Sequence, residues 1–456
     1  MKSRFLFVVI LATLLLPIVP AHFVSAQVPL TTAFAVQNMG TQDATIVVQW
    51  YAEEGDLVYT SPSVVVAPGA LGNFLAGTGL ASSWSGSVVI SADQPIAAIS
   101  NTTNDFGSPS YWGSSEGFKA EALSTNAYLP FVLRDRGGRN STIGVQNTGS
   151  AQANVYINFI GHSSSPVNFQ VVKTLNAGAS TILNLNSEVT SLGSGWMGSV
   201  IITSTQKVAA SALDMGSNIV YAYSGVPAPA TDLVMPFVVG GRSGQDTAHA
   251  LLNPNTVAAN VTITYTGESG GVPVQVVVNR QLQPSEMWNQ LHSAQTGSGF
   301  LGSAILHSDQ PVLGIVNHTY GSFAAAGRKM AYSMINAATL TPNISLPYVL
   351  RARSNKAQGV IIQNAGTVPT TLSVSFTPLA GTGNGTAYTY TKVVQPGQFY
   401  NFGTSFAEWN PIQDGAYGTM VVTNSANVNI VAIVNTWSTN VSSGVDSLGS
   451  YIGINY

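Results

Sequence analysis

One short stretch of the chain has the residue types of a nucleophilic enzyme site. Residues 267–271 read Gly-Glu-Ser-Gly-Gly and fit Gly-x-Ser-x-Gly, with His249 upstream as a candidate base. A serine nucleophile needs a histidine within hydrogen-bond reach and a strand-to-helix turn. Ser269 instead lies between two segments of alternating polarity, which predicts the tip of a β-hairpin. We therefore expect no catalysis at this stretch and no enzymatic activity.

Histidines are concentrated in the same part of the chain. The residues concerned are His249, His292, His307 and His318. A metal site would need them to converge and to be supported by carboxylates. Because His307 and His318 replace Ser91 and Thr102 of an earlier repeat, we interpret them as surface residues that vary between repeats. The chain has no cysteine, which excludes thiol catalysis and cysteine-bound metals, so no metal and no cofactor is expected.

Basic residues gather just after the first predicted strand of three repeats. They are Arg134, Arg136, Arg139, Arg242, Arg351, Arg353 and Lys356. Spaced basic patches of this kind could contact an anionic wall polymer or polysaccharide. They could also protect strand ends against edge pairing and keep the domain junctions solvated, which is the interpretation that we favour.

Aromatic residues mark the loops in which the repeats differ most. These candidate ligand contacts are Tyr111, Trp112, Tyr320, Phe323 and Trp437. Variable loops on a repeated scaffold are where recognition is commonly built, and exposed aromatics there suit glycans or protein partners. The alternative is that these rings fold back onto their own domain.

The elements that must position these residues are repeated four times, in units of about 110 residues, which is a common domain size. The best-kept phrase is an aromatic-x-Gly followed by apolar residues, as in 84–90, 196–202, 300–306 and, more loosely, 417–422. Its recurrence at one position predicts a core aromatic, with the glycine admitting close packing, rather than a sugar-stacking platform. Four copies of a small module favour a spacer, a scaffold or a multivalent binder over an enzyme.

Alternating polarity predicts half-buried strands in every repeat. The clearest runs are Thr45–Tyr51, Ala153–Ile160, Asn260–Thr266 and Thr371–Thr377, and each follows a turn that contains Asn. After the aromatic-x-Gly come two apolar runs separated, in the first and third repeats, by Asp-Gln-Pro, which predicts a hairpin covered on both faces. About seven strands per repeat and no amphipathic helix predict antiparallel β-sandwiches.

The expected fold class is therefore all-β, with four tandem sandwich domains. The boundaries are 27–127, 128–232, 233–344 and 345–456, and a related Leu-Pro-aromatic or Met-Pro-aromatic strand opens every domain but the first. The linkers are very short, so we expect an elongated, semi-rigid array.

The first 26 residues have the pattern of a secretion signal. Lys2 and Arg4 precede an apolar run, and Val24-Ser25-Ala26 provides a small-x-small cleavage site. We therefore expect a secreted, extracellular protein, with association at the cell surface. No later segment has the roughly 20 apolar residues of a membrane span.

Charge is scarce in this sequence. Only 8% of the 456 residues are charged and the formal net charge is −3, so nothing favours binding to nucleic acid. Because little electrostatic repulsion opposes it, we expect self-association.

The Gln-Asn-Thr-Gly turn, the alternating strand after it and the strand introduced by Pro-Gly resemble bacterial secreted and cell-surface proteins built from tandem immunoglobulin-like or fibronectin-III-like modules. That resemblance covers essentially all of 27–456 and implies surface display or adhesion, with a cell-envelope glycan or another surface protein as partner. The first hypothesis is a non-enzymatic structural or adhesive protein that presents loops. The alternative is an array of carbohydrate-binding modules that serves a separate enzyme.

Overall fold

The computed structural model describes residues 6–12, 30–75, 80–81, 84–103, 112–216, 219–320, 328–403, 407–438 and 448–456. The fold is all-β, built from antiparallel sheets, as the alternating segments predict. Its helices are single turns such as α1 (Leu185–Glu188) and α2 (Ser293–Thr296). In the described part of the chain, no helix is both long and apolar enough to cross a membrane.

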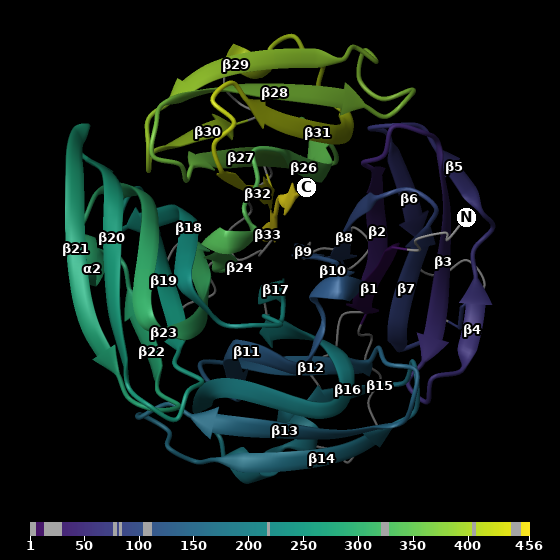
Figure 1. The fold of residues 1–456 in the computed structure, drawn as a ribbon, viewed down its shortest axis with the longest axis vertical. Helices are drawn as coiled ribbons and strands as arrows, with labels where there is room; N and C mark the ends of the chain where they lie inside the picture. The colour runs from purple at the N-terminus through teal and green to yellow at the C-terminus, as the bar shows by residue number, and fades with distance from the viewer. Residues whose placement is uncertain are drawn as a thin grey trace.

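The strands form four sandwiches, each with an outer and an inner sheet, placed around a common centre (Figure 1). The outer layer of the first sandwich contains β1 (Leu6–Ala12), β3 (Ala44–Ala52), β4 (Leu57–Thr60), β5 (Val64–Val66), β7 (Gly86–Ala92) and β10 (Phe118–Lys119). Its inner layer contains β2 (Thr31–Asn38), β6 (Leu71–Leu75), β8 (Ile96–Thr103) and β9 (Trp112–Glu116).

In the second sandwich, the long strand β16 (Trp196–Gly216) runs through both layers. The outer layer adds β11 (Ser124–Arg134), β13 (Ala153–Gly161) and β14 (Phe169–Leu175). The inner layer adds β12 (Arg139–Asn147), β15 (Ser180–Asn184) and β17 (Ile219–Ser224).

The third and fourth sandwiches repeat this plan. The third contains β18 (Ala230–Gly240), β20 (Ala259–Ser269), β21 (Val272–Leu282) and β25 (Ile335–Asn336) outside, β19 (Gln245–Leu252), β22 (Met287–Leu291) and β24 (Arg328–Ser333) inside, and β23 (Phe300–Tyr320) in both layers. The fourth contains β26 (Ile344–Leu350), β28 (Thr370–Pro378), β29 (Tyr388–Val394), β31 (Tyr417–Asn424) and β34 (Ile454–Asn455) outside, and β27 (Lys356–Asn364), β30 (Phe399–Gly403), β32 (Ile430–Ser438) and β33 (Gly449–Ile452) inside.

The expected hairpin after the aromatic-x-Gly is wrong. In the first sandwich β7 pairs with β1 and β3 in the outer sheet, whereas β8 pairs with β2 and β9 in the inner sheet. The Asp-Gln-Pro stretch carries the chain from one layer to the other, and Asp93 Oδ1 accepts a hydrogen bond from the Thr45 N–H at 2.8 Å. Both arms are central strands, which explains why they are apolar at nearly every position.

The glycine of the repeated phrase is needed because another backbone approaches it closely. A Cβ on Gly86 would lie 2.0 Å from the Tyr51 carbonyl oxygen, and one on Gly418 would lie 2.0 Å from that of Thr377. The aromatic residues Trp196 and Phe300 are buried in their own cores, as predicted. Trp84 is only half-buried, and Tyr417 lines a pocket between the fourth and first sandwiches. The phrase therefore belongs to the scaffold in the second and third repeats.

The expected elongated array is also wrong, because the four sandwiches close into a ring. Thr419 Oγ1 of the fourth sandwich donates to the Gly69 carbonyl of the first at 2.6 Å, and Ser345 Oγ hydrogen-bonds Gln37 Oε1. Ala35 and Ile99 of the first sandwich also join the hydrophobic core of the fourth. The first and last repeats are thus neighbours (Figure 1).

The repeated serine and glutamine positions join neighbouring sandwiches. Ser87 Oγ accepts from Gln146 Nε2 across the first junction at 2.7 Å, and Ser303 Oγ accepts from Gln363 Nε2 across the third at 3.0 Å. Ser303 Oγ also donates to the carbonyl of the turn glycine Gly397 at 2.7 Å. The same repeats that build each core therefore also build the ring.

At the centre, the inner edge strands β9, β17, β24 and β33 lie against one another around the ring. Ser224 Oγ donates to the Glu116 carbonyl at 2.6 Å, and Ser333 Oγ donates to the Ser224 carbonyl at 3.0 Å. The Glu116 carboxylate accepts from the backbone of Ile452, and burial raises the pKa of this carboxyl to about 7. These contacts involve equivalent positions of all four sandwiches.

Candidate binding pockets at the sandwich junctions

Three of the four junctions contain a pocket built from equivalent positions. The pocket between the second and third sandwiches has a volume of about 350 Å³, that between the third and fourth about 600 Å³, and that between the fourth and first about 360 Å³. Volumes of this size suit small-molecule ligands. We name them the 2/3, 3/4 and 4/1 pockets.

One wall of each pocket is the aromatic residue that follows the strand proline. Phe131 lines the 2/3 pocket, Phe237 the 3/4 pocket and Tyr348 the 4/1 pocket. In every case the strand shifts register next to the proline. The missing proline N–H therefore costs the sheet no hydrogen bond. The strand that opens one sandwich thus turns an aromatic ring toward the next sandwich.

The opposite wall carries two asparagines, from the two inner strands that flank a third strand of the next sandwich. The pairs are Asn289 and Asn317 in the 2/3 pocket, Asn401 and Asn435 in the 3/4 pocket, and Asn73 and Asn101 in the 4/1 pocket. Strand register makes the three pairs equivalent, because each pair flanks matching positions of the strand between them. Primary amides can donate and accept, so each pair can bind a group with both functions.

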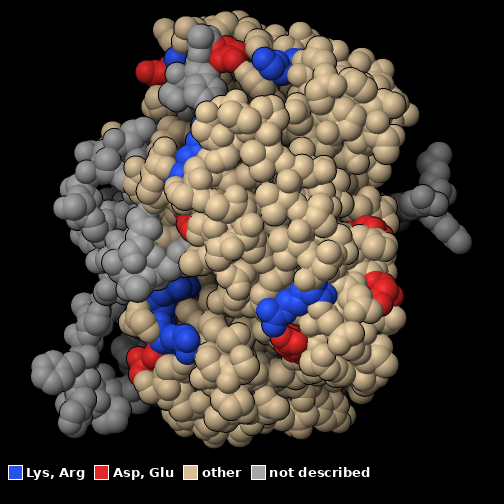
Figure 2. Space-filling view, turned by 90° about the vertical axis from the view of Figure 1, so that its left-hand side faces the viewer, with Lys and Arg blue, Asp and Glu red and all other residues tan. Residues whose placement is uncertain are grey.

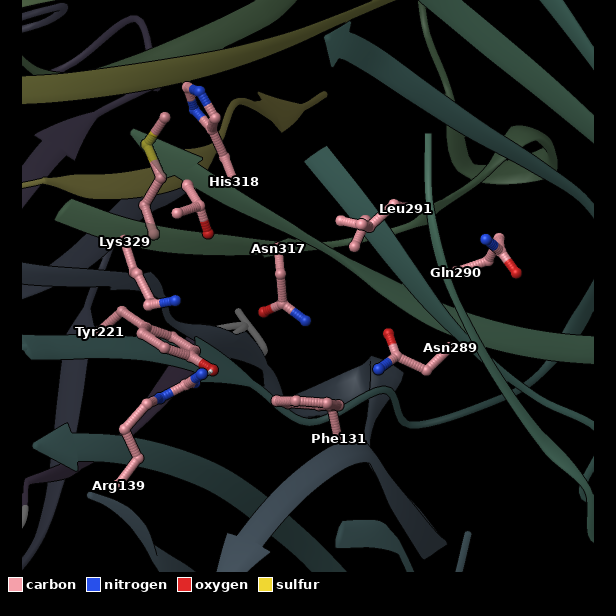
Figure 3. Close-up of a pocket in the computed structure, with 12 residues that line it drawn as sticks. Phe131, Arg139, Tyr221, Asn289, Gln290, Leu291, Asn317, His318 and Lys329 are labelled. Atoms are coloured by element: carbon pink, nitrogen blue, oxygen red, sulfur yellow. Dashed lines mark hydrogen bonds between the residues drawn. The ribbon is translucent and has the colours of Figure 1, made fainter. Parts of the chain in front are cut away.

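The 2/3 pocket also contains a buried charged group (Figure 3). Arg139 hydrogen-bonds the carboxylate of Asp214 and the hydroxyl of Tyr221, and the Arg139 and Asp214 side chains are only 11% and 2% exposed. Burial acts to lower the pKa of Arg139, but Asp214 and Tyr221 together outweigh it and raise the pKa. The amides of Asn289 and Asn317 point into the space beside the Phe131 ring.

Several buried atoms that line the pockets have no hydrogen-bond partner within the described chain, and most of them are acceptors. In the 2/3 pocket these include Asn317 Oδ1, His318 Nδ1 and Thr319 Oγ1; in the 3/4 pocket they include Asn401 Oδ1. Burial lowers the pKa of His318 to about 3, so its ring is neutral. With its Nε2 3.0 Å from Gln245 Oε1, an acceptor, His318 carries its proton on Nε2 and leaves Nδ1 as an acceptor. These atoms are suited to a ligand that donates hydrogen bonds.

Aromatic residues are most numerous in the 4/1 pocket. The Trp112 ring stacks on Tyr348 with ring centres 6.3 Å apart, and Tyr348 lies 5.8 Å from Tyr417. Arg353 lies 4.0 Å from the centre of the Tyr417 ring and Lys356 lies 5.0 Å from that of Trp112. Burial raises the pKa of the Tyr348 hydroxyl to about 12 and lowers the pKa of Lys356.

The junction between the first and second sandwiches is different at the equivalent place. Leu30 packs there against Leu213 and Val220 in a small hydrophobic cluster. Register places Ile182 and Leu213 where the other sandwiches carry the asparagine pair. Aliphatic side chains therefore fill this place. The pocket that this junction does have, of about 370 Å³, lies elsewhere, between Tyr51 and Val89 of the first sandwich and Gln146 and Gly178 of the second.

The predicted aromatic contacts have different outcomes. Trp112 is 7% exposed and forms part of the 4/1 pocket, whereas Tyr320 is 41% exposed and lines the 3/4 pocket with Trp437. Tyr111 and Phe323 lie outside the described residues. The structure thus brings Tyr320 and Trp437 together and keeps Trp112 at another junction.

Most of the predicted basic cluster is engaged within the chain. Arg134 and Arg136 donate to backbone carbonyls, including that of Gly195 at 2.7 Å, and Arg351 binds Asp414. Arg242 pairs with Glu268 at 2.8 Å. Figure 2 shows one face of the molecule, on which scattered cations lie near acidic groups in a mostly uncharged surface. The side chains that reach the pockets are Arg139, Arg242, Arg353 and Lys356.

The interpretation of His307 and His318 as surface residues is wrong for His318, which is 4% exposed. His249 and His292 are also fully buried and are hydrogen-bonded to each other. His307 remains exposed and pairs with Asp232. Across the described residues, no group of three or more His, Cys, Asp or Glu side chains is arranged to hold a metal ion.

Ser269 lies where the hairpin prediction put it, at the end of β20, and Gly270 and Gly271 make the turn to β21 with positive φ angles. Its Oγ is 3.4 Å from the Ser298 carbonyl oxygen. His249, in contrast, is buried in the inner sheet beside Trp288.

Sequence reasoning missed the asparagine pairs, although a signal was present. Asn101, Asn317 and Asn435 lie at the start of the variable segments, and the second repeat has no asparagine at the equivalent Leu213. Pairing them with Asn73, Asn289 and Asn401 requires the strand order of the inner sheet.

Comparisons with known proteins assign no family to this chain. No protein-family model matches the chain, and no curated protein matches it. One matching solved structure is titled "Crystal Structure of Thermotoga maritima 1070"; it is 16% identical, the match covers 24% of this chain and 95% of that chain, and the TM-score is 0.20. A likeness this low supports no conclusion about function.

Proposed function

We propose that this protein is an exported, non-enzymatic binding protein whose three junction pockets hold small saccharides. The observation that carries the proposal is the threefold recurrence of one arrangement, an aromatic wall facing an asparagine pair. Core packing alone has a simpler solution in the same molecule, because at the junction between the first and second sandwiches the equivalent place is filled with leucine and valine. Export rests on the signal pattern of residues 1–26, and each sandwich would be an immunoglobulin-like module.

The chemistry of the walls favours a ligand rich in hydroxyl groups. A flat aromatic face suits the C–H face of a sugar ring, and amides bind vicinal hydroxyls as donor and acceptor together. The unpartnered acceptors Asn317 Oδ1, His318 Nδ1 and Asn401 Oδ1 require donors, which hydroxyls supply. The charged residues that line the pockets are cations, so neutral and acidic sugars are both compatible.

A structural role is the second candidate, and the closed ring supports it. Hydrogen bonds across the junctions and around the centre favour a rigid body over separate modules on a string. The two roles are compatible if the ring presents its pockets outside the cell. Three sites on one rigid body would give avidity for a repeating glycan of the cell envelope.

Binding to a panel of soluble oligosaccharides tests the proposal. For a glycan that binds, Asn435→Leu combined with Asn401→Leu should weaken binding at the 3/4 pocket about tenfold or more, because polar contacts worth at least 1.4 kcal/mol are lost. Asn154→Leu, at an exposed position of β13, is the matched control and should change nothing. Equal binding by all three proteins would contradict the assignment of this pocket.

A further inference from the structure

The first sandwich obtains its opening outer strand from an unexpected part of the chain. β1 pairs antiparallel with β7 over seven residues, from Leu6 opposite Ala92 to Ala12 opposite Gly86. It also pairs with β10, where Val9 is opposite Phe118. β11, β18 and β26 occupy the same position in the other sandwiches, so this position is part of the common architecture.

β1 lies entirely within the predicted export signal. Cleavage after Ala26 would remove the whole strand and leave residues 27–29 ahead of Leu30. Three residues span at most about 10 Å, which is too short for a seven-residue strand. Leu30 is itself held in the hydrophobic cluster at the junction with the second sandwich. The remaining N-terminus therefore cannot refill the position.

Loss of β1 would leave an unpaired edge inside a sheet. β7 is a central strand, and its residues Val88 and Ile90 are fully buried. Without a neighbour on the β1 side, the N–H and C=O groups of β7 that face it become a template for another strand, and β10 loses its pairing. Adding an extended segment at such an edge is a known mode of peptide recognition.

We propose that the exported protein accepts, between β7 and β10, an extended segment of a partner polypeptide that runs antiparallel to β7. The equivalent strands define what fits. Leu129, Met235 and Leu346 are fully buried opposite Val200, Ala304 and Met420, the counterparts of Val88. The partner segment is therefore at least seven residues long, with apolar side chains at alternate positions, including the one opposite Val88.

Disulfide trapping tests this register directly, because the chain has no cysteine of its own. The protein beginning at Gln27 and carrying Val89→Cys is mixed with a peptide of the Leu6–Ala12 sequence, flanked by lysines for solubility, in which cysteine replaces Val9. Val9 and Val89 are directly opposite, so a disulfide should form and the melting temperature should rise. A peptide with cysteine in place of Val8 should give about tenfold less product, because a one-residue slip turns the side chain to the other face.

Val65→Cys is the control within the same sandwich, since Val65 is 65% exposed on β5 and away from the β1 position. Equal trapping of the peptide by Val65→Cys and Val89→Cys would overturn the proposal, as would no trapping by Val89→Cys. An intact N-terminus that still contains Leu6–Ala12 in the exported protein, shown by mass spectrometry, would overturn it as well. None of the substitutions lies in the 2/3, 3/4 or 4/1 pocket, so saccharide binding is a separate readout.

Discussion

The junction between the first and second sandwiches and the other three junctions solve the same packing problem in different ways. At the first, Leu30, Leu213 and Val220 fill the equivalent place. At the others, an aromatic ring and two asparagines leave a pocket. Both halves of the site are missing together, because the first repeat lacks the Pro-aromatic strand and the second repeat lacks the asparagine pair. Both halves of the arrangement are thus absent from the same junction.

The largest effect is expected from breaking the buried ion pair of the 2/3 pocket. Asp214→Ala leaves Arg139 buried without its carboxylate, which should lower the free energy of unfolding by about 3–5 kcal/mol. Denaturant unfolding of the variant measures this loss. Asp414→Ala breaks the ion pair with Arg351, but Asp414 is 72% exposed, so the change should stay below about 1 kcal/mol. Similar losses in both variants would show that the pocket does not hold its charges away from solvent.

Acid should weaken the polar junctions around the third sandwich. The pKa of His318 is about 3 in the folded protein against about 6.5 when unfolded, so the unfolded chain binds more protons between these values. The contribution of neutral His318 to the free energy of unfolding is therefore fully present above about pH 6.5. It decreases as the pH falls toward 3. His249 and His292, whose pKa values burial also lowers, act in the same direction.

Melting temperatures between pH 4 and pH 8 measure this effect. His318→Thr copies Thr436, the equivalent residue of the fourth sandwich, and should reduce the loss in acid without abolishing it. An unchanged acid dependence in this variant would mean that His318 can be protonated without cost, in conflict with its burial.

A smaller effect should come from exchanging the two kinds of junction. Asn317→Leu copies Leu213 and removes an unpartnered buried oxygen, so it should stabilise the protein by about 1 kcal/mol while removing the amide from the 2/3 pocket. Leu213→Asn introduces a polar group among aliphatic side chains and should destabilise by about 1–3 kcal/mol. Chemical denaturation measures the free energy of unfolding of both variants. If both substitutions changed it in the same direction, the two kinds of junction would not differ as described.

Within a single sandwich the sequence was sufficient for the alternating strands and the Asn turns, but not for the change of layer between β7 and β8. The alternating runs lie in β3, β13, β20 and β28 and are half-buried, and the Asn turns form as expected. Asn147, for example, is fully buried; its amide donates to the Ala151 and Leu175 carbonyls, and its Oδ1 accepts from the Gly149 N–H. Such hydrogen bonds join residues of the same repeat, so the sequence of one repeat is enough to predict them.

Relations between sandwiches could not be predicted in the same way. Gln146 and Ser87 recur because they bond across a junction, but recurrence shows only that a position is constrained, not which neighbour constrains it. A rod and a ring of four units have the same internal repeats, and they differ only in the contact between the first and last. The asparagine pairs could not be predicted for the same reason, because each pair faces an aromatic residue that belongs to another repeat.

The most direct test of the account is the number of saccharide molecules bound per chain, measured by native mass spectrometry with a glycan that binds. The unaltered protein should bind up to three, and Asn317→Leu, which removes an amide from the 2/3 pocket, should bind one fewer. Leu213→Asn alone should add none, because the first junction has no aromatic wall. Unchanged stoichiometry in Asn317→Leu, or no binding of any saccharide to the unaltered protein, would contradict the assignment of the junction pockets as the binding sites.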